Sequence, residues 1–236
     1  ELSFRHNARL HEHVRFLYSN GSMYKCCNSN LLYHGCIPMT ENREFDGLMV
    51  GGKMYRGKEL MDFIDTQVKN AYFLPEDAPE KEACRDFMWY LWNGAKSPVF
   101  GKDKNRSFEH YFIEDPEVMR ETMNPYYQLS EEEETCDMIL KEFGLPTKGS
   151  HIINGHMPVK IKSGETPIRA GGKLFIIDGG LSKAYQERTG IAGYTLIFNS
   201  HHLALAEHKP FDPERERTPK VYIVEKMQKR ITVADT

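Results

Sequence analysis

Two histidines stand where short apolar segments end beside glycine and proline. Asn30–Pro38 reads Asn-Leu-Leu-Tyr-His-Gly-Cys-Ile-Pro, and His151–Lys160 reads His-Ile-Ile-Asn-Gly-His-Met-Pro-Val-Lys. In each, β-favouring residues predict a strand that glycine and proline end, which presents His34 and His156 at a sheet edge. One such histidine alone is better explained as a half-buried turn residue than as a metal ligand. The second copy of the pattern favours one shared metal site.

The chemistry of this site depends on its ligands. Two imidazoles suit manganese, iron, zinc or cobalt, and they do not suit an ion that takes only oxygen ligands. Hydrolysis with a second ion normally needs carboxylates too, yet the sequence has no Gly-Asp and no Asn-His pair to supply them. Cys26, Cys27 and Cys36 are a poor zinc set, because adjacent cysteines in a strand point to opposite faces and no Cys-x-x-Cys is present.

Composition narrows the class of protein. The 236 residues are 40% hydrophobic, enough to bury a substantial core in one large domain or two small ones. The 31 basic and 34 acidic residues give a net charge of -3, which argues against nucleic acid or an anionic membrane as the main partner. No apolar stretch approaches a span of about 20 residues, and no basic-then-apolar leader opens the sequence. We expect a cytoplasmic protein with reduced cysteines.

Apolar residues at helical spacing predict four helices. The last should begin with a capping box of Ser130 and Glu133, and glutamates 131–134 should form its solvated first turn rather than a metal site. The apolar faces are Leu10, Val14 and Leu17; Leu60, Ile64, Val68 and Ala71; Ala83, Phe87, Tyr90 and Leu91; and Cys136, Ile139, Leu140 and Phe143.

Turn residues divide the remaining chain into strands. Hairpins are expected at 28–30, 51–52 and 200–201, and the chain after His156 is nearly all β. The predicted fold is α/β, with a core from residues 1–39 and 150–236 and a mostly helical insertion at 40–149. Within it, 97–127 should be an irregular lid pinned to the core by its aromatic rings, with three cations that are candidates for a phosphate contact: Lys102, Lys104 and Arg106.

The two histidine segments resemble the last two ligand motifs of calcineurin-like metallophosphatases, strand-His-Gly-x-x-Pro and Gly-His-x-Pro. Longer strings resemble class III fructose-1,6-bisphosphatase, the type found in Firmicutes, and the likeness covers essentially the whole sequence. The fold it implies is the C-terminal half of a calcineurin-like β-sandwich with a helical insertion. The strings are Asn30–Pro38, Met88–Gly94, His151–Lys160 and Asp178–Tyr194.

The resemblance implies a manganese-dependent phosphatase of gluconeogenesis that removes the 1-phosphate of fructose 1,6-bisphosphate. Water would attack in line at a two-metal site while cationic side chains hold the developing charge. His34 and His156 match ligand positions on one metal, and Lys183 and Tyr185 are the candidate substrate contacts. Met157 stands where the family has threonine, which removes a hydroxyl beside His156.

The superfamily's carboxylate motifs are missing and Glu1 is not an initiator methionine, so we expect an internal or C-terminal fragment that is inactive alone. It would supply no catalytic acid or bridging carboxylate of its own. A dinucleoside polyphosphate hydrolase or a phosphoprotein phosphatase would share both histidine motifs, and a non-catalytic binding or assembly module is the alternative from another class. The expected partner is a small sugar bisphosphate, and a homo-oligomer is compatible with the sequence.

Overall fold

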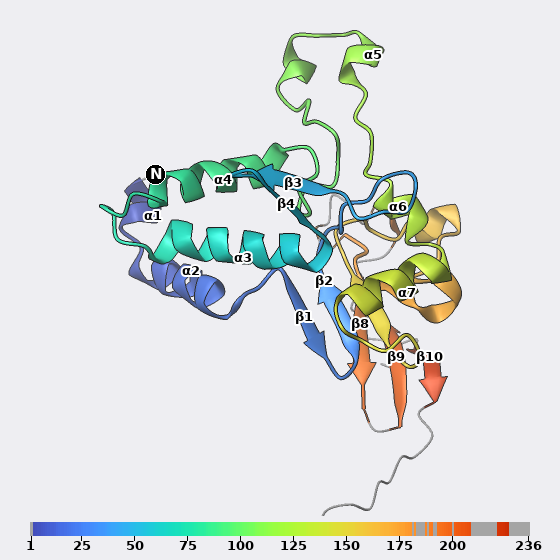
Figure 1. Ribbon diagram of the computed structural model, residues 1–236. Coiled ribbons are helices and arrows are strands. Elements are labelled where there is room, and N and C mark those ends of the chain that lie inside the picture. The colour runs from blue at the N-terminus through green and yellow to red at the C-terminus, as the bar shows by residue number, and fades with distance from the viewer. Residues whose placement is uncertain are drawn as a thin grey trace, which may run out of the picture.

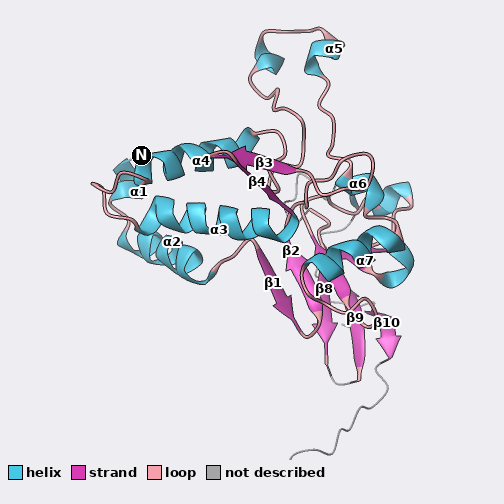
Figure 2. Ribbon diagram, in the orientation of Figure 1, coloured by secondary structure: helices cyan, strands magenta, loops and turns pink. Residues whose placement is uncertain are grey.

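The computed structural model describes residues 2–180, 182, 187, 189–190, 193–199, 201–208 and 221–226, the last five of these by their backbone alone. It is a mixed α/β protein (Figures 1 and 2). The helices are α1 (Leu2–Arg5), α2 (Ala8–Asn20), α3 (Gly57–Phe73), α4 (Lys81–Asn93), α5 (Pro116–Met119), α6 (Tyr126–Leu129) and α7 (Glu133–Glu142). The strands are β1 (Tyr24–Cys27), β2 (Asn30–Tyr33), β3 (Gly47–Val50), β4 (Lys53–Arg56), β5 (His151–Asn154), β6 (Ile168–Arg169), β7 (Leu174–Ile176), β8 (Tyr194–Phe198), β9 (His202–Glu207) and β10 (Val221–Lys226).

The largest sheet brings the two histidine segments together. Its strand order is β1-β2-β5-β7-β6, with β2, β5 and β7 parallel and the two edge strands antiparallel to their neighbours. Neighbouring parallel strands end on the same side of a sheet, so the residues that follow β2 and β5 meet there. The expectation of a sheet edge for His156 was wrong, because β5 lies inside the sheet and His156 follows its carboxyl end.

Two tight hairpins form where the turn residues predicted them. Asn28 and Ser29 connect β1 to β2 with φ angles of 50° and 60°. Gly51 and Gly52 connect β3 to β4 with φ angles of 58° and 79°. Positive φ at both central residues matches the right-handed twist of the flanking strands. The first of these turns leads into β2, and His34 directly follows that strand.

One hydrophobic core joins α7 to both larger sheets. The second sheet, β10-β9-β8, is antiparallel and includes the predicted hairpin between β8 and β9. Ile139 and Leu140 of α7, Ile152 of β5, and Leu203 and Leu205 of β9 belong to the same buried cluster. Because α7 shares this core, the end of segment 40–149 packs directly beneath the strand that leads to His156. The division at residues 39 and 149 stays a prediction.

A second, smaller cluster forms between α3 and α4. Leu60, Ile64 and Leu91 are its buried members. In α4, Cys84 is buried one residue beyond the predicted Ala83, which is exposed, and the predicted Leu91 is buried. The aromatic ring of Tyr18 on α2 stacks on Tyr72 of α3, with centroids 4.3 Å apart. The described α2 forms as predicted, yet it buries none of its residues.

The predicted capping box is wrong. The N-cap of α7 is Glu132, whose side chain makes no capping hydrogen bond, and Ser130 instead ends α6 by donating its backbone N–H to Tyr126. The glutamates at 131–134 are exposed, as expected. Glu132 and Glu134 pair with Arg43. These ion pairs, with the end of α6, set the start of α7 without a capping side chain.

Segment 97–127 is largely irregular, as predicted, and its last two rings are pinned to the core, because Tyr126 is buried in it and Tyr127 packs against it. The rings in the middle of the segment are not pinned. Phe108, Tyr111 and Phe112 are exposed. Figure 1 shows this segment as an arm that projects from the body and carries α5 near its end. Across the described part of the chain, no helix has the length and apolar character needed to span a membrane.

Candidate functional site

The two predicted metal ligands lie side by side. Tyr33 at the end of β2 pairs with Asn154 at the end of β5. The residues that follow the two strands therefore begin at the same height along the sheet. Nδ1 of His156 is 3.3 Å from Nε2 of His34, and the imidazole planes meet at 84°. This confirms the predicted approach of the two side chains. His34 is exposed and His156 half-buried, so a ligand can reach the pair from solvent.

Gly155 permits this close approach. Its N–H donates a 3.1 Å hydrogen bond to the carbonyl oxygen of His34. A Cβ on Gly155 would lie 3.1 Å from Nδ1 of His34, which is tighter than ordinary van der Waals contact. His156 itself has a φ of 64°, a left-handed conformation that is uncommon outside glycine. The backbone is therefore bent at His156, which turns its ring toward His34.

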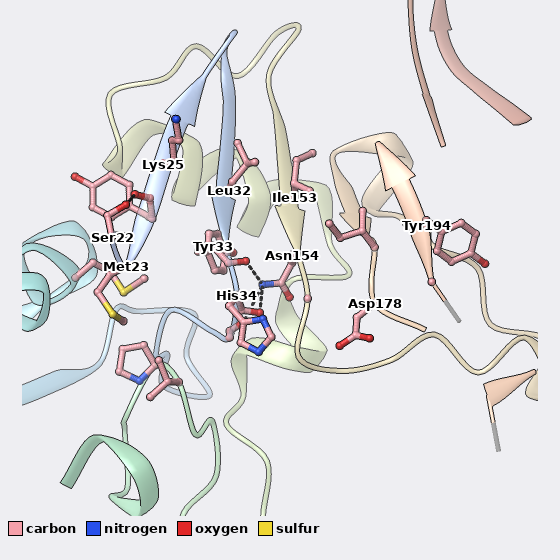
Figure 3. Close-up of a pocket in the computed structure, with 18 of the residues that line it drawn as sticks. Ser22, Met23, Lys25, Leu32, Tyr33, His34, Ile153, Asn154, Asp178 and Tyr194 are labelled. Atoms are coloured by element: carbon pink, nitrogen blue, oxygen red, sulfur yellow. Dashed lines mark hydrogen bonds between the residues drawn. The ribbon is translucent and has the colours of Figure 1, made fainter. Parts of the chain in front are cut away.

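Asn154 fixes the turn that holds His34. Its buried side-chain amide donates to three carbonyl oxygens, those of Tyr33 and His34 at 3.2 Å each and that of Gly35 at 2.8 Å (Figure 3). Buried carbonyls that lose a donor cost free energy, so these bonds hold the β2 end in one conformation. Asn154 was not predicted as a site residue, because its only signal in the sequence is that it is a polar residue ending an apolar strand.

The base of the arm packs against the same turn. The N–H of Cys36 donates a 2.8 Å hydrogen bond to the carbonyl oxygen of Pro98. A Cβ at Gly35 would collide with that carbonyl oxygen, so only glycine allows the two backbones to come this close. The glycine of the His-Gly motif thus serves the contact between β2 and the segment that leads into the arm.

A cleft of about 830 Å³ opens beside the histidine pair. One part of it is lined by His34, Gly155, Asp178 and Tyr194 (Figure 3). Lys25 of β1 also lines the cleft. The Asp178 carboxylate accepts a 2.8 Å hydrogen bond from the N–H of Gly180, which fixes its side chain where β7 ends. The remaining wall is mainly apolar and includes Met23, Leu32, Met61, Val99 and Ile153.

The surroundings favour a neutral His156. Burial is the main cause that lowers the pKa of His156, and the neighbouring His34 lowers it further. A backbone hydrogen bond involving Phe100 and the charge of Asp178 act in the opposite direction, while Lys102 at the base of the arm adds to the lowering of this pKa. Only a neutral imidazole has a free nitrogen lone pair for a metal.

The spacing of the pair fits one shared metal ion. Two metal–nitrogen bonds of about 2.1 Å that meet at roughly 90° to 110° place the nitrogens about 3.0 to 3.4 Å apart, and the observed separation is 3.3 Å. Within the residues that the structure describes, no group of three or more His, Cys, Asp or Glu side chains could hold a metal ion. The donor set offered here is thus two imidazoles, and metal binding stays a prediction.

The comparison with known proteins decides the family. The family model of Firmicute fructose-1,6-bisphosphatase matches residues 1–236. The chain belongs to this family. No solved structure matches it.

Several curated class 3 fructose-1,6-bisphosphatases are similar in sequence to this chain. The class 3 fructose-1,6-bisphosphatase of Finegoldia magna is 49% identical over 99% of this chain and 37% of its own length. A class 3 enzyme of Clostridium beijerinckii is 54% identical over 89% of the chain and 32% of its own length. That of Fusobacterium nucleatum is 48% identical over the whole chain and 38% of its own length. The chain spans well under half the length of these relatives.

The predicted substrate contacts of this fructose-1,6-bisphosphatase family member divide into two groups. Lys183 and Tyr185 lie outside the described residues. In the arm, Lys102 pairs with Glu121 at 2.6 Å, and Arg106 pairs with Glu109 at 2.7 Å. The positive charge of Lys102 contributes to the lowered pKa of His156.

Proposed function

We propose that this chain is the part of a fructose-1,6-bisphosphatase that gives two histidine ligands to its metal site. In this proposal it forms the C-terminal half of a calcineurin-like β-sandwich. The observation that supports it best is the 3.3 Å approach of His34 Nε2 and His156 Nδ1 at the ends of neighbouring parallel strands. Family membership supports the substrate, fructose 1,6-bisphosphate, and with it a cytoplasmic role in gluconeogenesis.

In this proposal, the chain's own residues hold the metal ion and keep its ligands in place beside the substrate. Manganese, when bound, supplies Lewis-acid stabilisation of the charge that develops on the phosphoryl group. His34 and His156 would hold it through the two nitrogens that face each other. Asn154 and Gly155 keep these rings in place through their bonds to the His34–Gly35 turn. The cleft beside the rings offers room for the sugar bisphosphate.

The phosphate groups need cationic partners, and we propose Lys183, with Tyr185 as a second contact. Lys183 follows the segment Asp178-Gly179-Gly180, where glycines let the backbone approach a ligand closely. Lys183→Ala in the whole enzyme should lower kcat/KM by roughly tenfold to a hundredfold, the effect of one charge-assisted phosphate contact. If that variant keeps wild-type kinetics at low ionic strength, Lys102 becomes the candidate.

The test of the proposed function uses the whole enzyme with manganese. His156→Ala should abolish release of phosphate from fructose 1,6-bisphosphate, because it removes one of the two ligands. His13→Ala, on the exposed surface of α2, is the matched control and should retain activity. The 236-residue chain alone should show no turnover, since a two-metal mechanism needs carboxylate ligands and no group of three or more His, Cys, Asp or Glu among the described residues could hold a metal ion. Retained activity in His156→Ala would contradict the proposal.

The same assay separates the alternatives. A dinucleoside polyphosphate hydrolase or a phosphoprotein phosphatase would release phosphate from those substrates in preference to the sugar bisphosphate. A non-catalytic module would leave all three intact even in the whole protein with manganese. Family membership over residues 1–236 favours the sugar phosphatase among the three.

A further inference from the structure

The tip of the arm exposes an unusual amount of aromatic surface. The arm comprises residues 102–122. Tyr111 and Phe112 leave 81% and 86% of their surface in water, and Phe108 is also largely exposed. Ile113 and Val118 extend this apolar surface. The rings of Tyr111 and Phe112 adjoin, with centroids 6.4 Å apart, and an exposed apolar patch on a soluble protein marks a contact with another surface.

The base of the arm is built to hold it away from the body. The N–H of Asp103 donates to the carbonyl of Thr122, and the N–H of Thr122 donates to the Asp103 carboxylate, at 2.9 and 2.7 Å. Glu121 pairs with Lys102 and also accepts from the N–H of Arg106, at 2.6 and 2.8 Å. These bonds tie the two chain segments at the base to each other, and the arm projects from the body (Figure 1).

The tip is also acidic. Residues 107–119 contain Glu109, Glu114, Asp115 and Glu117 and no lysine or arginine. Arg106 neutralises Glu109. Among the described residues the other three form no ion pair, although Asp115 accepts the N–H of Glu117 as the N-cap of α5. The surface that the arm fits should therefore be apolar and basic.

Helices α1 and α2 provide a surface of that kind, which we call the α1–α2 surface. Neither helix buries any of its residues. Leu2, Phe4, Phe16 and Leu17 are exposed large apolar side chains, and Phe16 leaves 65% of its surface in water. Residues 2–20 contain Arg5, Arg9 and Arg15 against one acid, Glu12.

A groove of about 290 Å³ adjoins this surface. It lies between α2 and α3 and is lined by Leu17, Tyr18, Met23 and Val68 among others. Asp65 and Lys69 also line it and pair with each other, and the apolar part of the lining suits an aromatic side chain from outside. The tip of the arm and the α1–α2 surface thus match in both apolar character and charge.

The two surfaces do not meet within one chain. Figure 1 shows α5 at the far end of the projecting arm, and α1 and α2 on a different side of the body. We propose that the tip of the arm binds the α1–α2 surface of a second copy of this chain. A two-fold arrangement would let each copy give its arm and receive the other, so both contacts form in one closed dimer.

Sedimentation velocity of the 236-residue chain over a concentration series tests the association. The chain should form a dimer, and Phe112→Ser should raise the dimer Kd by about thirtyfold or more, as expected for a central aromatic anchor. Trp89→Ser is the control, because Trp89 on α4 is 63% exposed and lies outside both surfaces. A chain that stays monomeric at every concentration, or equal effects of the two variants, overturns the proposal.

Charge exchange tests which surfaces meet. Glu114→Lys with Glu117→Lys should weaken the dimer by about tenfold, as should Arg9→Glu with Arg15→Glu. A chain with all four changes should recover wild-type association, because the attraction is restored with the signs reversed. Failure of this chain to recover, while circular dichroism shows it folded, overturns the pairing.

A photo-crosslinker at position 112 identifies the occupant directly. Equal amounts of isotopically light and heavy chain are mixed, and crosslinked peptides are identified by mass. Mixed light–heavy crosslinks to residues 2–20 or 65–69 are the expected result. Crosslinks within one chain, to another surface, or, in the whole enzyme, only to residues outside this chain overturn the proposal.

Discussion

The side-chain amide of Asn154 donates a 2.8 Å hydrogen bond to the carbonyl oxygen of Gly35, across 119 positions of the sequence. The same nitrogen reaches the carbonyls of Tyr33 and His34 at 3.2 Å. One buried side chain on β5 therefore holds the end of β2, and with it the first histidine of the pair.

Asn154→Ala should lower the free energy of unfolding by about 1 to 3 kcal/mol, because it leaves buried carbonyls without their donor. Urea denaturation measures this change. Asn42→Ala is the matched control, since Asn42 is exposed, and it should stay within about 0.5 kcal/mol of wild type. Equal effects of the two substitutions would show that the Asn154 bonds contribute nothing.

The hydroxyls of Tyr33 and Tyr126 lie 2.6 Å apart and connect β2 to α6 inside the core. Burial raises the pKa of both hydroxyls, so both are neutral in the physiological range. Tyr126→Phe removes one partner and should destabilise the protein by about 1 to 2 kcal/mol. Thermal unfolding of this variant beside Tyr111→Phe, whose hydroxyl is exposed, checks the prediction. Identical melting temperatures would contradict it.

His156 should titrate below the ordinary histidine value of about 6.5. Burial and His34 lower its pKa, so the folded state disfavours the protonated ring. The contribution of this ring to the free energy of unfolding should therefore be fully present above pH of about 6.5. It should be lost as the pH falls from about 6.5 through the lower pKa of the folded state. A nuclear magnetic resonance titration of the His156 ring measures the midpoint. A midpoint at or above about 6.5 would contradict the expected direction.

The sequence predicted the elements whose local signals agree with their final packing. The hairpin turns at 28–29 and 51–52 need residues that accept positive φ, and asparagine and glycine supply them. The buried positions of α7, Cys136, Ile139 and Leu140, repeat at helical spacing. The proximity of the two histidines followed from two strand ends of the same type.

The rest depends on contacts between distant residues. Asn154 looks like any other asparagine in the sequence, because the three carbonyl groups that it binds belong to a distant segment, residues 33–35. Ser130 and Glu133 match a capping box in sequence, but Ser130 is the C-cap of α6. The exposed rings of the arm look like core residues in sequence, because local composition does not reveal that the arm leaves the body.

The most direct test of the shared site is selective paramagnetic broadening of histidine ring signals by manganese. The chain has ten histidines, which serve as internal controls for one another. Substoichiometric Mn²⁺ should broaden the ring signals of His34 and His156 together and before the others, and His34→Ala should remove the effect at His156. If His34 and His156 stay sharp while other histidines broaden, or if one broadens without the other, the two rings do not hold a common metal ion.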